Sequence, residues 1–453
     1  MVTVTAPAAS SAAVPRPTLH ARSAFAIAIG IVVGAGIFRT PSLVAAGSSS
    51  ELVFLSAWLV GGVLSIIGAL CYAELASTYP EAGGDYSYLR RAFGRRLAFL
   101  YAWARLAVIQ TGSIALLAFV VGDYLAQLLP IGPWSATVYA AVAVVALTTI
   151  NWLGMRQGSG TQNWLTVVEI LGLVLIVAVC LLLAPDAPVD PLAVAGGNGY
   201  GLILVFVLLT YGGWSEAVYV TAEVRDARRV MPRILTGSLA AVAILYLMVN
   251  FAYLKVLGLG GIAGSDAVAA DAMHVVLGAP GAAAISVLVV VAALTSANAT
   301  MITGARSAYA AGRDFPALAW IGRWDQRSGS PRTAMLVQGA LALLLVGVGA
   351  LARDGFGTAV EYTAPVFWLF FLLVGIALLV LRRRDPDAPR GFRVPLYPLL
   401  PLLFCATSAY LLYSSLAYTG IGALVGVAVL AIGGLLLLVF NPRPSSTHDV
   451  RNP

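Results

Sequence analysis

Twelve long apolar runs constrain this chain more than any other feature of its sequence. A membrane-spanning helix needs about 20 mostly apolar residues, and runs of that kind recur along nearly the whole chain. They lie near residues 23–46, 53–78, 97–124, 133–153, 162–184, 201–221, 234–258, 281–308, 333–352, 360–381, 396–417 and 419–440. Only 10% of the residues are charged, against roughly 25% in a soluble domain. The sequence therefore predicts an all-α integral membrane protein with twelve transmembrane helices.

The basic residues predict how these helices are oriented. Twelve spans place both termini on one side of the membrane. With the N-terminus inside, the inner segments hold 23 of the 27 lysines and arginines, the outer segments hold three, and Arg105 lies within a span. This agrees with the positive-inside rule, so we expect a multi-pass protein of the cytoplasmic membrane, typical of a bacterium, with both termini cytoplasmic. The net charge of +7 then reflects topology and contact with anionic lipid, and nucleic acid is not indicated as a partner.

The remaining composition excludes several classes of function. The three cysteines all lie in apolar runs and the three histidines are scattered, so neither a disulfide framework nor a metal site is indicated. A nucleotide-binding loop of the G-x-x-x-x-G-K type is missing from the sequence, which argues against ATP-driven pumping. We expect no cofactor and no obligatory protein partner. The first 22 residues are predicted to form a disordered cytoplasmic tail, and residues 441–453 a second tail.

Glycine clusters interrupt two of the predicted spans. The first covers Gly30 to Phe38 in span one, and the second covers Thr210 to Trp214 in span six. Irregular backbone within a membrane must line a cavity or be buried in protein. Close helix packing through small residues would explain either cluster alone. However, the two spans open two five-helix halves, and interrupted helices at corresponding positions of two halves indicate a transporter site.

The chemistry of a broken helix suggests the substrate. The break frees backbone amides at a positive helix end, which suit a carboxylate. It also frees carbonyl groups, which suit an ammonium group. A site with both kinds of group fits a zwitterion, and a free amino acid is the commonest one.

Five segments of the sequence form recognisable motifs. They are GAGIF at 34–38, ELASTYPEAGGDYSY at 74–88, YGGW at 211–214 followed by AEVRD at 222–226, RSAYAAGRDFP at 306–316, and RGFRVPLYP at 390–398. With these motifs the chain resembles the amino acid-polyamine-organocation superfamily, close to the bacterial relatives of the L-type amino acid transporters. The resemblance covers residues 22 to 440.

This resemblance implies a LeuT-type fold and secondary active transport of amino acids by alternating access. It implies two inverted five-helix repeats, 23–184 and 201–381, and two peripheral helices in 396–440. It also implies substrate-binding residues in the two interrupted spans, namely Ile31, Gly34, Ala35, Gly36, Ile37, Leu209, Thr210, Tyr211 and Gly212. The amides of residues 34–36 would bind the carboxylate, and the carbonyls of Ile31 and Leu209 would bind the amino group.

The sequence departs from the family pattern at two positions. Leu209 stands where many relatives carry an aromatic gate, so we expect a weaker gate or one supplied by Phe206 or Phe38. Glu169 stands in span five where many relatives carry a lysine. The role of that lysine therefore cannot be transferred to this chain.

Arg105, Glu169 and Glu216 are ionisable residues within spans, where charge is expensive and usually functional. Arg105 and Glu169 each lie about eight residues from the inner end of their helix, or about 12 Å. This equal depth predicts an ion pair, which is either a proton-linked coupling device or a static structural lock. Glu216 is expected to pair with a loop arginine, and Trp214 to support the broken helix. Ser296, Asn298 and Thr300 are expected to bond neighbouring helices in preference to a sodium ion.

Three further functions stay open. The first is transport of a polyamine or another organic cation. The second is a sensor that binds an amino acid without moving it. The third, a membrane enzyme, is disfavoured because no histidine lies deep in a span and no acidic pair recurs at catalytic spacing. The transporter reading itself leaves proton symport and amino acid exchange as alternatives.

Overall fold

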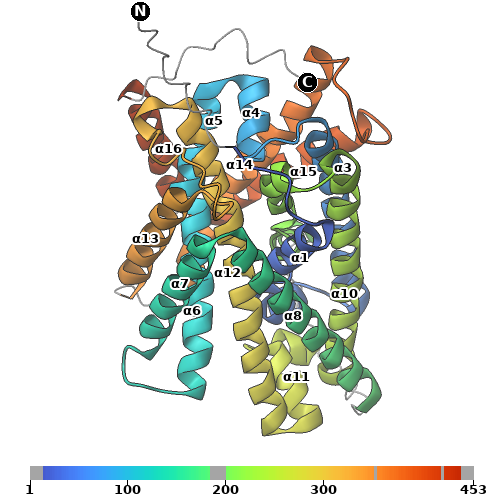
Figure 1. The fold of residues 1–453 in the computed structure, drawn as a ribbon. Coiled ribbons are helices and arrows are strands. Elements are labelled where there is room, and N and C mark those ends of the chain that lie inside the picture. The colour runs from blue at the N-terminus through green and yellow to red at the C-terminus, as the bar shows by residue number, and fades with distance from the viewer. Residues whose placement is uncertain (1–13, 184–199, 351–354, 420–422, 440–453) are drawn as a thin grey trace, which may run out of the picture.

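The computed structural model describes residues 14–183, 200–350, 355–419 and 423–439, and these are almost entirely helical (Figure 1). In chain order the helices are α1 (Ala21–Val32), α2 (Gly36–Ala46), α3 (Glu51–Thr78), α4 (Asp85–Phe93), α5 (Arg95–Ala104), η1 (Arg105–Ile109), α6 (Gln110–Leu128), α7 (Ser135–Leu153), α8 (Met155–Leu183), α9 (Tyr200–Thr210), η2 (Trp214–Glu223), α10 (Ala227–Ala263), α11 (Val268–Leu277), α12 (Ala279–Asp314), η3 (Pro316–Leu318), α13 (Arg332–Gly349), α14 (Gly355–Arg384), α15 (Leu399–Thr419) and α16 (Ala423–Val439).

Within the described residues, ten helical stretches are long and apolar enough to cross a membrane, and the bent pair α1–α2 makes eleven. Each of the first eleven predicted spans coincides with one of these. The twelfth run coincides with α16, which has 17 residues and is shorter than a usual span. The all-helical membrane architecture is therefore confirmed, and the count of twelve stays a prediction.

Burial shows which helices form the centre of the bundle. In the apolar 18-residue stretch of α12, 78% of the residues are buried within the protein, and in that of Ile203–Glu223 the share is 72%. The corresponding share in α7 is 28%. The helix α1 packs against α8, α10, η2 and α12, and lies in the middle of the bundle in Figure 1. Large apolar side chains on the outer helices, such as Leu182 and Leu435, are exposed, as expected where lipid replaces water as the solvent. The two interrupted helices are thus enclosed by other helices.

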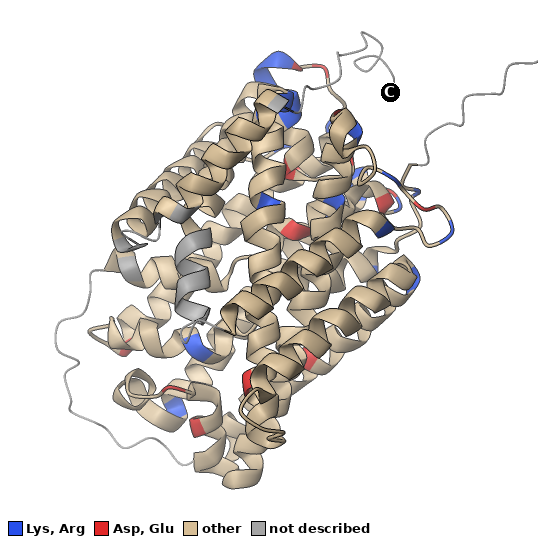
Figure 2. Ribbon diagram, turned by 90° about the vertical axis from the view of Figure 1, so that its left-hand side faces the viewer, with Lys and Arg blue, Asp and Glu red and all other residues tan. Residues whose placement is uncertain are grey.

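Most lysines and arginines lie toward one end of the bundle (Figure 2). Buried ion pairs join helices there. Arg382 of α14 contacts the Glu74 carboxylate at 2.7 Å, and Arg390 reaches the same group at 3.4 Å. Arg306 of α12 binds Glu223 of η2 through two hydrogen bonds, of 2.5 and 2.8 Å. Because both acids are buried, removing a partner would leave an uncompensated charge. These pairs fix the relative positions of α3, η2, α12 and α14.

The chain before α1 is tied to the end of η2. The Leu19 amide donates to the Glu223 carbonyl at 2.7 Å, and the Arg225 amide donates to the Leu19 carbonyl at 3.1 Å. Leu19 is buried, and α1 begins at Ala21. The predicted tail of 22 residues is therefore too long at its C-terminal end, because backbone pairing orders this segment. Residues 1–13 and the predicted tail 441–453 lie outside the described residues.

Candidate functional site

The first glycine cluster is a break between two helices. The helix α1 ends at Val32, α2 begins at Gly36, and their axes differ by 41°. The Gly34 amide turns back to the Val32 carbonyl at 2.9 Å. The first amides of a helix have no acceptor within the helix, so the N-terminal end of α2 presents backbone donors and a positive dipole end at the break.

The second glycine cluster is a break of the same kind. The helix α9 ends at Thr210, a turn covers 211–213, and the 3₁₀ helix η2 begins at Trp214. Gly213 has a φ of +94°, in the left-handed region that only glycine adopts without strain. The Gly212 amide donates to the Leu209 carbonyl at 3.0 Å.

The two breaks face each other. A Cβ atom at Gly36 would lie 3.1 Å from Cγ2 of Thr210, and one at Gly213 would collide with Ile31. The hydroxyl of Tyr246, on α10, lies 2.7 Å from the Val32 carbonyl oxygen and 3.4 Å from that of Thr210. Tyr246 therefore connects the last residue of α1 with the last residue of α9.

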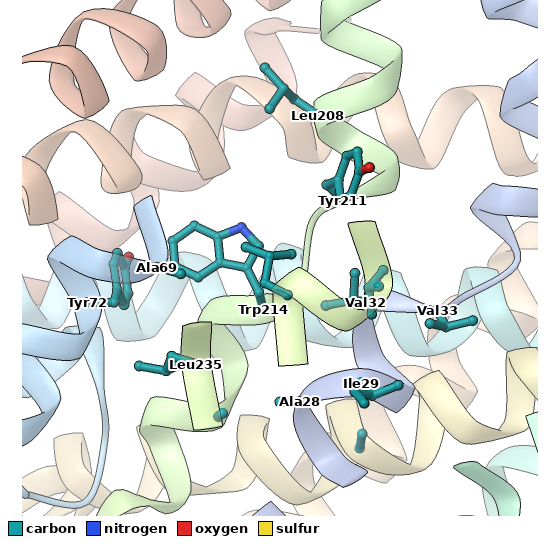
Figure 3. Close-up of a cluster of buried hydrophobic side chains, with 14 of the residues drawn as sticks. Ala28, Ile29, Val32, Val33, Ala69, Tyr72, Leu208, Tyr211, Trp214 and Leu235 are labelled. Atoms are coloured by element: carbon teal, nitrogen blue, oxygen red, sulfur yellow. The ribbon is translucent and has the colours of Figure 1, made fainter. Parts of the chain in front are cut away.

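The residues expected from the family resemblance surround this junction. Ile31, Gly34 to Gly36, Leu209 and Gly212 are partly exposed, whereas Val32, Val33, Ile37 and Tyr211 are buried. The breaks thus leave short stretches of backbone accessible within an otherwise apolar cluster, part of which is drawn in Figure 3. This arrangement suits a small polar ligand that is bound mainly through backbone groups.

Helix α12 closes one side of the break in α1. The Ser296 hydroxyl donates to the Gly30 carbonyl at 2.8 Å and approaches that of Ile31 at 3.4 Å. The Asn298 amide group donates to Gln162 of α8 at 2.9 Å. Ser296 and Asn298 therefore form hydrogen bonds to neighbouring helices, as expected for the polar residues of this span.

Trp214 packs away from the breaks. Its ring lies 5.0 Å from that of Tyr72 and 5.6 Å from that of Phe371 between centroids, and Figure 3 shows it turned toward Tyr72 and Ala69. This burial among aromatic rings of α3 and α14 agrees with a supporting role for Trp214. At the gate position, Leu209 is partly exposed, as is Phe206, whereas Phe38 is buried.

The predicted pair of Arg105 with Glu169 is wrong for this structure. Arg105 binds Glu216 instead, through a 2.9 Å hydrogen bond from Nη1 and a second, shorter contact from Nη2. The expectation that Glu216 pairs with a loop arginine is wrong for the same reason. Helix α8, which carries Glu169, packs against α1, α10 and α12, whereas η1, which carries Arg105, packs against α5, α6, α12 and α14. The structure also begins α5 at Arg95 and α8 at Met155, so Glu169 lies farther from the start of its helix than Arg105 does.

Glu169 is fully buried, and neither carboxylate oxygen has a hydrogen-bond partner among the described residues. An isolated ionised carboxylate is costly to bury. Thr166, one turn earlier on the same helix, donates to the Ala26 carbonyl of α1 at 3.2 Å. Glu169 is therefore on a helix that contacts the broken span.

Sequence reasoning missed Tyr246, Gln110 and Thr303. Gln110 and Thr303 bind the Glu216 carboxylate at 2.9 and 2.6 Å. The only signal for these residues was a polar side chain within an apolar run, and such residues often serve only helix packing.

A bundle of apolar helices with two facing helix breaks at its centre is typical of a membrane transporter. The chain belongs to the amino acid permease family, whose model matches residues 19–442. It is 27% identical to the serine/threonine exchanger SteT of Bacillus subtilis over 419 residues, which cover 90% of this chain and 94% of that protein. It is 28% identical to the b(0,+)-type amino acid transporter 1 of mouse, covering 86% of this chain and 80% of that protein. It is also 28% identical to the human large neutral amino acids transporter small subunit 2, covering 91% and 78%.

Proposed function

We propose that this protein moves amino acids across the cytoplasmic membrane of a bacterium by alternating access, with both termini on the cytoplasmic side. The observation that carries the proposal is the pair of facing breaks, joined by Tyr246. The proposed architecture is a LeuT-type bundle of twelve spans, with inverted repeats at 23–184 and 201–381 and peripheral helices in 396–440. The family match and the eleven spans favour it.

The proposed substrate site combines the two breaks. The amides of Ala35, Gly36 and Ile37 bind the substrate carboxylate at the positive end of α2. The Gly34 amide joins them when it releases the Val32 carbonyl, to which it donates in this conformation. The carbonyls of Ile31 and Leu209 accept from the substrate ammonium group. Thr210, Tyr211 and Gly212 form the opposite wall, and the side chain at Leu209 limits the size of the bound amino acid.

Two modes of coupling fit the chain. Exchange is favoured by the similarity to SteT, which is named as an exchanger. Proton symport is favoured by Glu169, whose buried carboxyl lacks a partner among the described residues. In the symport version, Glu169 takes up a proton while buried and releases it when the helices around it rearrange, with no need for a pair with Arg105.

The test is a binding screen of the purified protein followed by counterflow in proteoliposomes. The screen covers the natural amino acids and the common polyamines and records ligand-induced changes in thermal stability. We expect an amino acid to stabilise the protein and to exchange across the bilayer in counterflow. Binding without counterflow would identify a sensor, and stabilisation by polyamines alone would identify an organic cation carrier.

A further inference from the structure

A second buried polar cluster surrounds Arg105, next to the second helix break, because the Glu216 amide donates to the Gly213 carbonyl at 2.9 Å. Its acids are Glu216 of η2 and Asp85, the first residue of α4. Arg105, Glu216 and Asp85 are 2%, 7% and 3% exposed. The cluster thus joins the loop between spans two and three to the interrupted sixth span. In the proposed orientation, this cluster lies toward the cytoplasmic end of the bundle.

Glu216 is saturated with hydrogen bonds. Its carboxylate accepts from both terminal nitrogens of Arg105, from Gln110 at 2.9 Å and from Thr303 at 2.6 Å. Four donors around one carboxylate stabilise its charged form. Glu216 is therefore the ionised partner of the guanidinium.

Asp85 has weaker support for a charge, although a hydrogen bond from Tyr219 also favours its ionised form. Its Oδ2 accepts from the Tyr101 hydroxyl at 3.1 Å, and its Oδ1 has no partner among the described residues. The titratable groups that face it from the packed elements are Tyr72 of α3, Tyr88 of its own helix α4, Tyr101 of α5, Arg105 of η1, and Glu216 and Tyr219 of η2. Arg105 is the one cation among these groups, and Glu216 already neutralises it.

A cavity of about 10 Å³ lies beside the Asp85 side chain. Asp85, Arg105 and Ser215 line it, together with Phe370 and Phe371. The Nε atom of Arg105 is a second buried atom without a partner in the described structure. A space of this size holds about one water molecule, provided that polar groups bind it. A water there would accept from Nε and donate to Oδ1.

The balance of charges in the cluster favours the protonated form of Asp85. Two carboxylates and one guanidinium would leave one net negative charge in a closed, mostly aromatic surrounding, and such a charge is costly. We propose that Asp85 is a proton-binding site that holds the cytoplasmic end of this transporter closed while the proton is bound. The inference rests on the proposed transport function and adds a point of control to it.

The energetics of Asp85 support this assignment. Burial raises the pKa of the Asp85 carboxyl from 3.8 to about 6, against the opposing attraction of Arg105. A raised pKa means that the closed form binds the proton more tightly than an exposed aspartate does. When the cytoplasmic end opens, the carboxyl becomes hydrated and passes its proton to water, leaving a carboxylate and a hydronium ion. Acidification of the cytoplasmic side therefore favours the closed end, and alkalinisation favours the open end.

The experiment measures amino acid counterflow in oriented proteoliposomes while the pH on the cytoplasmic side is varied and the other side is held constant. We expect the wild-type rate to fall as that pH falls through about 6. The asparagine in Asp85→Asn carries no charge at any pH, so the counterflow rate of this variant should be low and independent of pH.

A milder pair of variants covers the case in which Asp85→Asn fails to fold. Tyr101→Phe removes a hydrogen bond that favours the ionised form, so it should move the midpoint to higher pH. The matched control is Tyr88→Phe, because the Tyr88 hydroxyl has no partner among the described residues, and its midpoint should stay near the wild-type value. An unchanged midpoint in Tyr101→Phe would overturn the proposal.

Two outcomes separate the failure of this inference from the failure of the transport function. Wild-type counterflow that ignores cytoplasmic pH, or an Asp85→Asn variant with the wild-type pH profile, would overturn the role of Asp85 alone. Absence of counterflow at every pH would instead contradict the transport function. Infrared difference spectra then still test the site, because the signal of a protonated carboxyl should titrate near pH 6 in the wild type and be lost in Asp85→Asn.

Discussion

The hydroxyl of Tyr246 lies 2.7 Å from the carbonyl oxygen of Val32, the residue at which the first broken helix ends. The same hydroxyl lies 3.4 Å from the carbonyl oxygen of Thr210, the residue at which α9 ends. One fully buried side chain of α10 therefore positions both segments that are proposed to bind the substrate. The relative placement of the two breaks depends on a third helix.

Replacing Tyr246 by phenylalanine should weaken amino acid binding. A buried hydrogen bond contributes about 0.5–1.5 kcal/mol, which corresponds to a loss of affinity of about two- to tenfold. The loss should be similar for all substrates, because the hydroxyl holds backbone and not a side-chain pocket. Titration calorimetry of the purified variant measures it. Tyr253→Phe on the same helix is the control, since that buried hydroxyl has no partner among the described residues and its removal should leave affinity unchanged.

Gly36→Leu should abolish substrate binding and still give a folded, membrane-inserted protein. A side chain at this position meets Thr210 and occupies the space in which a carboxylate approaches the amides of α2. Gly347→Leu on α13 is a matched control, because nothing lies within 4 Å of its added Cβ. Ligand-induced thermal stabilisation of both variants provides the measurement. Wild-type affinity in Gly36→Leu would exclude the break in α1 as the carboxylate site.

Leu209→Phe should change the preference among amino acids or the transport rate more than it changes stability. Leu209 is partly exposed beside the second break, so a larger ring there reduces the space for the substrate side chain. Ile244→Phe, at an exposed position of α10, controls for the added ring. Competition of unlabelled amino acids against labelled substrate records the profile. If profile and rate are unchanged, another residue such as Phe206 forms the gate.

Glu169→Gln should remove the dependence of net uptake on a proton gradient and preserve counterflow, since exchange needs no net proton movement. Because Arg105 binds Glu216, the substitution leaves no unpaired arginine, and we expect thermal stability close to that of the wild type. Net uptake, counterflow and thermal unfolding are measured on the same preparation. A stable variant with full proton-driven accumulation would eliminate Glu169 as the coupling group.

Glu216→Ala should destabilise the protein strongly. It leaves the buried Arg105 guanidinium without its carboxylate, and breaking a buried pair in this way costs about 3–5 kcal/mol. Glu51→Ala, at an exposed position in the first turn of α3, should have a small effect. Thermal unfolding in detergent compares the two variants. Equal melting temperatures would show that Arg105 finds another partner.

Much of the architecture follows from local sequence. The apolar runs predicted eleven spans that the structure contains, because the need to satisfy backbone hydrogen bonds in lipid leaves a long apolar segment little choice but a helix. The glycine clusters predicted both helix breaks for a similar reason, since Gly213 adopts a φ of +94° that other residues avoid. The polar cluster around Glu216 and the bridging Tyr246 had no comparable signal.

The sequence by itself determined which segments are helices and where two of them break, because these properties depend on residues that are neighbours along the chain. Only the tertiary structure decided which helices lie side by side. Arg105 and Glu169 were expected to pair because of their similar distance from the helix ends, yet Arg105 binds Glu216 of η2 and Glu169 lies on α8. The physical reason is that depth follows from the rise along one helix, whereas the choice of partner depends on packing between helices far apart in sequence.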